Sequence, residues 1–277
     1  ANEEDEAVLK RAVALALDGD RLYVVDALDC MVKVFSMDGR FLRSFGRRGS
    51  GPGEMSLPSG VCVSDGAIVV ADKLNLRIQL FDDGGGARGG FRVLFPPDRV
   101  LALAAGRLLV TSNVSGRRGG ERLLHVYDLS GRLVWEGLEA RTTSDPVYDA
   151  FRNMILVCPG EEGDFYVIYR SGERAILHFE ASGALRSEIA VDERHVSRSV
   201  GMPLGRRKMR LDGFCWAASR DRGVFFLSAP EDKAGKDLGP GRTVSVIDGQ
   251  GRMEAVIGLP CAVHRFLVAG GRMFAID

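Results

Sequence analysis

Short apolar runs alternate with polar turns along the whole chain, and the same order of runs returns several times. The runs Val32–Phe35 and Ile78–Phe81 are each followed by a turn containing glycine, and their last residues stand 46 positions apart. A third copy ends at Tyr127, another 46 positions on, and later copies end at Phe179 and Ile247. This period, lengthened in the later copies, indicates one structural unit that repeats and carries insertions toward the C-terminus.

The repeating unit is made of strands. Its runs are rich in Val, Ile, Leu, Phe and Tyr and are bounded by Gly, Asp, Ser or Asn, which is typical of β-strands joined by turns. No window combines a helical period with helix caps. Four short antiparallel strands in a repeat of about 45 residues are typical of one blade of a β-propeller, in which neighbouring blades stack around an axis. The pattern therefore predicts an all-β propeller.

Six copies of the second strand predict six four-stranded blades in a single domain over residues 1–277. Because no further strand follows the sixth copy, we expect residues 5–11 to supply an outer strand of the last blade; the alternative is a ring that closes imperfectly. The six copies are Arg21–Asp26, Ala67–Asp72, Arg107–Ser112, Asp164–Ile168, Gly223–Ser228 and Arg272–Asp277.

The overall charge limits the classes of partner. The chain has 37 Lys or Arg and 37 Asp or Glu, which argues against nucleic acid as the main partner. No apolar run is long enough to span a membrane. The acidic start, Ala1–Glu6, is not a signal peptide. If it is what remains after a signal has been removed, the protein is periplasmic or extracellular. The sequence does not indicate an oligomeric state.

The histidines and cysteines do not predict a metal site. His125 and His178 fall on opposite faces of equivalent third strands, so they are not expected to join His264 in a zinc site. The five cysteines have no metal-ligand spacing and are expected to be core residues, with a single disulfide bridge as the alternative. We expect no catalytic residue, no metal and no cofactor. A calcium site of carboxylates and carbonyls would leave no sequence pattern, so calcium stays an open alternative.

One stretch carries a family resemblance. It consists of Gly51–Glu54, Leu57–Val61, Val70–Asp72 and Asn75–Ile78, and it resembles an NHL repeat. With its periodicity, the chain resembles the six-bladed NHL-like propellers common in bacteria. That resemblance implies a scaffold that binds protein or RNA, or a metal-dependent lyase or lactonase that works at the mouth of the central channel. The fold alone does not select among these functions.

The polar residues of this motif are expected to be structural. Asp72 ends a second strand and Arg77 begins a third, so a hairpin places them opposite each other as an ion pair. We expect a partly exposed pair, worth about 0–1 kcal/mol. Asn75 suits the turn between the two strands, because its amide can bond to neighbouring backbone.

A ligand of a propeller usually meets the loops at one mouth of the channel. Aligning the blades on the glycine after the first strand places Ser59, Arg99 and His264 at one structural position. A mixed ring of Asp, Arg, Tyr and His there could bind a polar or anionic ligand, or it could be an ordinary solvated rim. The candidate ligand-binding residues are Asp98, Arg99, Tyr148, Asp149, Asp212, His264 and Arg265.

A basic insertion separates the fourth and fifth blades. The segment from Arg194 to Arg210 holds six Lys or Arg and no acid. We expect a long loop beside the channel mouth that contacts an acidic partner; the alternative is a solvated cover over a blade. The candidate partner-binding residues are Arg206, Arg207, Lys208 and Arg210.

Two functions of different classes fit the sequence. A non-enzymatic scaffold would recognise a protein, a peptide, a carbohydrate or another small polar ligand through the channel mouth and the basic insertion. The alternative is a divalent-metal-dependent lyase or hydrolase, similar to a lactonase, that acts at the same mouth. The sequence favours the scaffold because no clustered set of metal ligands is visible.

Overall fold

The computed structural model describes residues 7–112, 114, 120–160, 163–169 and 175–190, and shorter stretches of the C-terminal part. The chain divides into two compact units: Ala1–Asn113 with Leu124–Gly137, and Val114–Leu123 with Leu138–Asp277. The shorter stretches are 200–204, 207–211, 217–220, 223–228, 241–248, 250, 252–263, 265–269 and 272–276.

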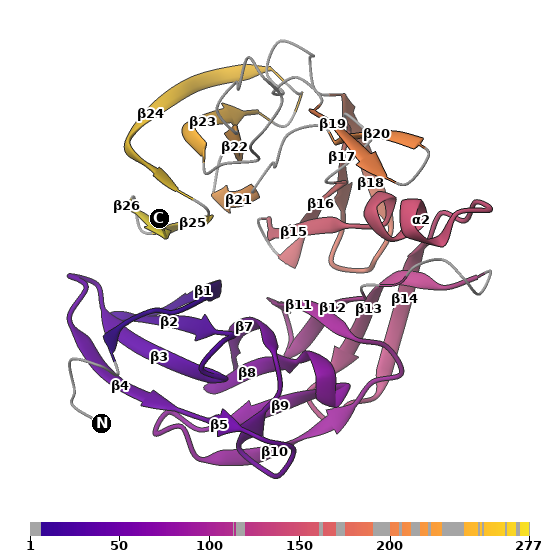
Figure 1. The fold of residues 1–277 in the computed structure, drawn as a ribbon. Coiled ribbons are helices and arrows are strands. Elements are labelled where there is room, and N and C mark those ends of the chain that lie inside the picture. The colour runs from indigo at the N-terminus through magenta and orange to yellow at the C-terminus, as the bar shows by residue number, and fades with distance from the viewer. Residues whose placement is uncertain are drawn as a thin grey trace. The chain divides into compact units, whose positions relative to one another are not determined.

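The first unit holds three four-stranded antiparallel sheets, each with its strands hydrogen-bonded in chain order (Figure 1). Short ends of two strands of the third sheet belong to the second unit. We call the three sheets blades 1 to 3. Blade 1 is β1 (Ala12–Asp18), β2 (Arg21–Asp26), β3 (Met31–Ser36) and β4 (Phe41–Phe45); blade 2 is β7 (Pro58–Ser64), β8 (Ala67–Asp72), β9 (Arg77–Phe81) and β10 (Ala87–Arg92); blade 3 is β11 (Pro97–Leu103), β12 (Arg107–Ser112), β13 (Arg122–Asp128) and β14 (Leu133–Glu139).

The first strands of the three blades lie side by side. β7 packs beside both β1 and β11 (Figure 1), so the first strand of each blade is the innermost. Because blade 2 is covered on both faces, all six residues of β8 are buried. Val25, Val32, Val70 and Phe81 belong to the resulting core between blades 1 and 2.

The second unit holds two further four-stranded sheets, blades 4 and 5, and two hairpins. β21 packs beside β15 and beside β25, as innermost strands of adjacent blades do. Blade 4 is β15 (Ile155–Pro159), β16 (Phe165–Tyr169), β17 (Ala175–Phe179) and β18 (Leu185–Ala190); blade 5 is β21 (Ala217–Arg220), β22 (Gly223–Ser228), β23 (Gly241–Ile247) and β24 (Met253–Val263); the hairpins are β19 (Val200–Leu204) with β20 (Arg207–Leu211), and β25 (Arg265–Ala269) with β26 (Arg272–Ile276).

The predicted repeat is confirmed. All six expected second strands are present, as β2, β8, β12, β16, β22 and β26, with ends that differ by at most one residue. The all-β prediction missed the short α-helix α2 (Pro146–Arg152) before blade 4 and the 3-10 helix Lys73–Asn75. The single domain over residues 1–277 stays a prediction. No helix in the described part of the chain has the length and apolar character needed to cross a membrane.

Residues 7–11 do not form the expected outer strand. The repeat shows why: with the 46-residue period, residues 8–11 correspond to residues 54–57, the crossing that leads into the first strand of blade 2. Their backbone N–H groups bond accordingly, from Lys10 and Arg11 to the buried carboxylate of Asp26. Residues 1–6 lie outside the described part of the chain, so the closure of the last blade stays a prediction.

Candidate binding face

One edge of blades 1 to 3 collects the polar motif residues. In each blade, the hairpin between the second and third strands lies at the same edge as the segment that enters the first strand, because the strands are antiparallel. We call this edge the hairpin face. It comprises residues 8–11, 26–31, 46–57, 72–77 and 92–99.

Asp72 organises the hairpin face of blade 2. Its side chain is fully buried and lies 2.8 Å from Nε of Arg77, so the predicted pair is confirmed. Arg77 is 20% exposed, so the pair is partly exposed on the arginine side and fully buried on the aspartate side. The carboxylate also accepts bonds from the backbone N–H of Ser56 at 2.7 Å, from Asn75 at 2.8 Å and from Gln79 at 3.1 Å.

The same side chains hold the crossing between blades 1 and 2. The guanidinium of Arg77 donates to the carbonyls of Gly51 and Glu54, each at 2.8 Å. Gln79 donates to the carbonyl of Glu54 at 2.7 Å. The carboxylate of Glu54 accepts a hydrogen bond from the backbone N–H of Gly51 and forms an ion pair with Arg47. These two contacts hold the pKa of Glu54 below its ordinary value. The Gly/Pro-rich crossing is therefore fixed by side chains.

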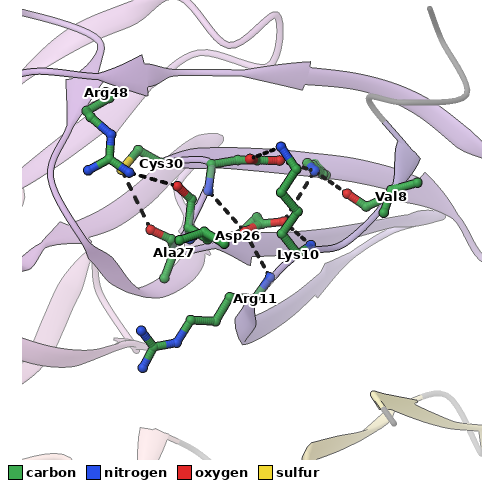
Figure 2. A network of polar contacts seen from close by, with 10 residues as sticks. Val8, Lys10, Arg11, Asp26, Ala27, Cys30 and Arg48 are labelled. Atoms are coloured by element: carbon green, nitrogen blue, oxygen red, sulfur yellow. Dashed lines mark hydrogen bonds and ion pairs between the residues drawn. The ribbon is translucent and has the colours of Figure 1, made fainter.

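Blade 1 builds the same arrangement from different residues (Figure 2). Asp26, 46 positions before Asp72, is fully buried and accepts the backbone N–H of Lys10 at 2.7 Å. Lys33 stands where Gln79 does and bonds to both Asp26 and the carbonyl of Val8. Blade 1 thus has a buried lysine in the position of a buried amide, with the same two kinds of acceptor.

A second carboxylate compensates the buried lysine. Asp29 lies 2.7 Å from the ammonium of Lys33, which is 1% exposed, and 2.6 Å from that of Lys10. Burial opposes ionisation of Asp29, but these two bonds outweigh it, so its pKa lies below the ordinary value. Lys33 was not singled out from the sequence, although the 46-residue alignment on Gln79 could have found it.

Arg99 and Asp98, two predicted ligand residues, are engaged inside the protein. The guanidinium of Arg99 donates to the carbonyls of Val13 at 2.9 Å and Ser59 at 2.8 Å, which belong to the innermost strands of blades 1 and 2. Asp98 lies 2.7 Å from the ammonium of Lys73. Both residues therefore tie blades together at the channel side of this unit.

The alignment that paired Arg99 with Ser59 is off by one residue. The first hairpin of blade 3 pairs Leu103 with Arg107 and has a three-residue turn, whereas that of blade 2 pairs Ser64 with Ala67 and has a two-residue turn. The irregular residue in the β7 ladder, between Pro58 and Gly60, is Ser59, and the one in the β11 ladder, between Pro97 and Arg99, is Asp98. Asp98 is therefore the equivalent of Ser59.

The hairpin face also carries exposed leucines. Leu28 and Leu74 stand 46 positions apart at the tips of equivalent hairpins and are 52% and 61% exposed. Leu94, on the crossing into blade 3, is fully exposed. Their hairpins are rigidly held, since the N–H of Leu28 bonds to Asp26 and that of Leu74 to the carbonyl of Ser56. Sequence reasoning missed these leucines, although Leu28 and Leu74 share one position in the repeat.

The remaining predicted ligand residues lie in the second unit or outside the described part. Tyr148 and Asp149 lie on α2, which begins with Asp145 as N-cap and Pro146 at its start, a signal that could have predicted the helix. Asp149 is 1% exposed and accepts the backbone N–H of Thr143 at 2.7 Å; its Oδ1 is buried with no partner among the described residues. Arg265 begins β25, and Asp212 and His264 lie outside the described residues.

The basic insertion is not a loop throughout. Val200–Leu204 and Arg207–Leu211 pair as the β19–β20 hairpin, so three of the four candidate partner-binding residues lie on β20. These are Arg207, Lys208 and Arg210, and Arg206 lies outside the described part. The role of the insertion in partner binding stays a prediction.

Burial changes the acid–base properties of two described cysteines and one described histidine. Burial raises the thiol pKa of Cys62 and of Cys158, which disfavours the reactive thiolate. Burial also lowers the pKa of His125 to about 4, and its ring stacks on Phe95 with a centroid distance of 4.0 Å. Among the described residues, no three His, Cys, Asp or Glu side chains form a group that could hold a metal ion.

Comparison with known proteins agrees with this architecture. Residues 3–82 match the family described as a 6-bladed β-propeller. Five four-stranded antiparallel sheets and the hairpin of a sixth follow one another along the described chain. The fold is a β-propeller. Protein lin-41 of Caenorhabditis elegans is 49% identical to this propeller over 43 residues, which is 15% of this chain and 4% of that protein. The propeller thus spans only a small fraction of that relative.

Solved structures share the fold at low sequence identity. A putative exported protein from Bacteroides fragilis has a TM-score of 0.62 and 15% identity, covering 91% of this chain and 72% of that chain. A luciferin-regenerating enzyme has a TM-score of 0.63 and 12% identity, covering 98% and 85%. Virginiamycin B lyase from Staphylococcus aureus has a TM-score of 0.56 and 11% identity, covering 97% and 78%. At such identities the likeness concerns the fold alone.

Proposed function

We propose that this propeller is a non-enzymatic binding module and that the hairpin face of blades 1 to 3 recognises a protein or peptide. One observation carries the proposal: Leu28 and Leu74 project into solvent from equivalent, rigidly held hairpins. Leucines exposed at equivalent positions of neighbouring blades offer apolar area that a partner can cover. A partner that covers them would gain affinity at little entropic cost, because the hairpins are already ordered.

The polar residues of the same face support binding rather than catalysis. Asp72, Asp98 and Arg99 all point into internal contacts, whereas a catalytic group must reach a substrate. The metal-dependent alternative has no supporting observation in the part of the chain that the structure describes.

A displayed library of random peptides, selected on the immobilised propeller, tests this function. We expect most enriched peptides to lose binding to the double variant Leu28→Ser/Leu74→Ser and to keep binding to Leu42→Ser. Leu42 is the matched control. It is 39% exposed and lies in blade 1, as Leu28 does, but near the start of β4, at the edge opposite the hairpin face. Peptides that bind all three proteins equally would refute the proposed face.

A further inference from the structure

The acidic and basic residues of the hairpin face differ in how many of them are paired within the protein. Each acid of this face is engaged by an internal partner, while three of its arginines are exposed without a carboxylate partner among the described residues. The engaged acids are Asp26, Asp29, Glu54, Asp72 and Asp98, and the exposed arginines are Arg11, Arg48 and Arg92.

From this imbalance we infer that the hairpin face binds an acidic peptide segment that also carries apolar side chains. The inference rests on the proposed function and names the partner class for the same face. The acids of the face are already neutralised within the protein, so the exposed arginines leave it with positive charge facing solvent. A partner with carboxylates complements that charge, and its apolar side chains cover the leucines.

Apolar and basic groups lie next to each other on this face. Arg48 donates at 2.9 Å to the carbonyl of Leu28, so its guanidinium lies against the hairpin that presents the leucine. Lys73 directly precedes Leu74, but its ammonium is already paired with Asp98, so the basic group offered to a partner here is Arg48. A peptide in which acidic and apolar side chains alternate could therefore satisfy both kinds of group along one extended stretch.

A peptide fits this face better than a nucleic acid does. Proteins that hold single-stranded nucleic acid combine positive charge with exposed aromatic side chains on which the bases stack. Within the described hairpin face, the aromatic side chain is Phe95, which is 9% exposed and stacked on His125. The exposed apolar groups are leucines, which match apolar side chains of a peptide.

The hairpins are preorganised for such a partner. Cys30 and Leu76, which stand 46 positions apart, both adopt the left-handed backbone conformation, with φ of 57° and 52°. The two hairpins therefore share one backbone conformation although their side chains differ. Leu28 and Leu74 occupy the same position in it. Little ordering is left to be done on binding.

Synthetic fluorescent peptides provide the direct test. The probes are a peptide of alternating Glu and Leu, its counterpart with Lys for Glu, its counterpart with Gln for Glu, and a single-stranded oligouridine. Binding to the full chain is measured by fluorescence anisotropy at low and high salt. We expect the Glu peptide to bind at least about tenfold more tightly than the Lys peptide at low salt, and to weaken as salt rises.

Two sets of variants separate the apolar from the charged contribution. Leu28→Ser/Leu74→Ser should weaken binding of the Glu peptide about tenfold or more, because two exposed leucines that the bound peptide covers are lost. Arg11→Ser/Arg48→Ser/Arg92→Ser should weaken binding at low salt and flatten the salt dependence. Leu42→Ser and Arg40→Ser, at the opposite edge of blade 1, should leave both unchanged. Thermal melting confirms that each variant is folded, and the salt dependence of the unmodified protein tests the charge argument by itself.

The possible results distinguish this inference from the proposed function. Tighter binding of the Lys peptide or of the oligouridine would overturn the inference. So would selected peptides that depend on Leu28 and Leu74 but are neutral or basic, and that result would leave the proposed function standing. Selected peptides that ignore both leucines would overturn the proposed function itself.

Discussion

Replacing Asp72 with alanine is expected to be one of the most damaging single changes in blade 2. The carboxylate is fully buried and accepts four hydrogen bonds, from Ser56, Asn75, Arg77 and Gln79. Removing one partner of a buried ion pair costs about 3–5 kcal/mol, because the other charge stays behind without compensation. That is a large share of the total stability of about 5–15 kcal/mol that a folded protein has.

The partner residue should cost less. Arg77→Ala leaves the carboxylate of Asp72 with its three other donors and frees the carbonyl of Gly51. We expect a loss of about 2–3 kcal/mol from the broken charged hydrogen bonds. In the double variant, the loss should fall short of the sum of the two single losses by about 1–3 kcal/mol, because both single variants remove the same interaction.

Urea unfolding followed by circular dichroism measures these differences. Asp72→Asn, which keeps the volume and one acceptor oxygen, should be milder than Asp72→Ala. Asp128→Ala is the matched control, because Asp128 also pairs with an arginine, at 3.0 Å, but that Arg132 is 79% exposed; its effect should be much smaller. Additive losses in the Asp72/Arg77 double variant, or an Asp72→Ala effect as small as that of Asp128→Ala, would refute the reasoning.

Three further changes test other parts of the fold. The pKa of His125 is about 4 in the folded protein, against 6.5 when unperturbed. Between these pH values the unfolded state binds more protons than the folded state. Lowering the pH from 7 to 5 should therefore reduce the free energy of unfolding by about 2 kcal/mol. His125→Phe should remove that dependence, and an unchanged pH profile in urea unfolding would contradict it. Arg99→Met should lower stability by about 1–3 kcal/mol by leaving two carbonyls without their donor; an unaltered melting curve would contradict this. Cys261 is exposed, whereas Cys62 and Cys158 are buried, so a thiol reagent should label Cys261 in the native protein and the other two only after unfolding, as peptide mass spectrometry would show.

The sequence predicted the repeat well because strand periodicity and turn residues are local properties. The six second strands and the Asp72–Arg77 pair follow from spacing alone. The burial of that pair could not be read the same way, because it depends on the crossing at Gly51 and Glu54 folding back over the hairpin. A contact between segments this far apart in sequence leaves no local pattern.

The positions of the candidate ligand residues were predicted less well, and their role in ligand binding stays a prediction. Asp98 and Arg99 were expected in a loop at the channel mouth, but they lie on β11, and their side chains turn to Lys73 and to backbone carbonyls of other blades. A one-residue difference in turn length was enough to misalign Arg99, because successive residues of a strand point to opposite faces. The leucines of the hairpin face were missed because the apolar pattern of the sequence does not distinguish a buried leucine from an exposed one.

The hydrogen bonds of Arg99 have a consequence for how this protein comes apart. In a repeat protein whose blades touch only their immediate neighbours, units can open one at a time. Arg99 of blade 3 also reaches Val13 of blade 1, a bond that skips over blade 2 and joins positions 86 residues apart. Local unfolding of blade 1 or of blade 3 therefore breaks the hydrogen bond between Arg99 and Val13, which helps to stabilise both blades. The first three blades should lose their amide protection together in hydrogen exchange, as one cooperative unit.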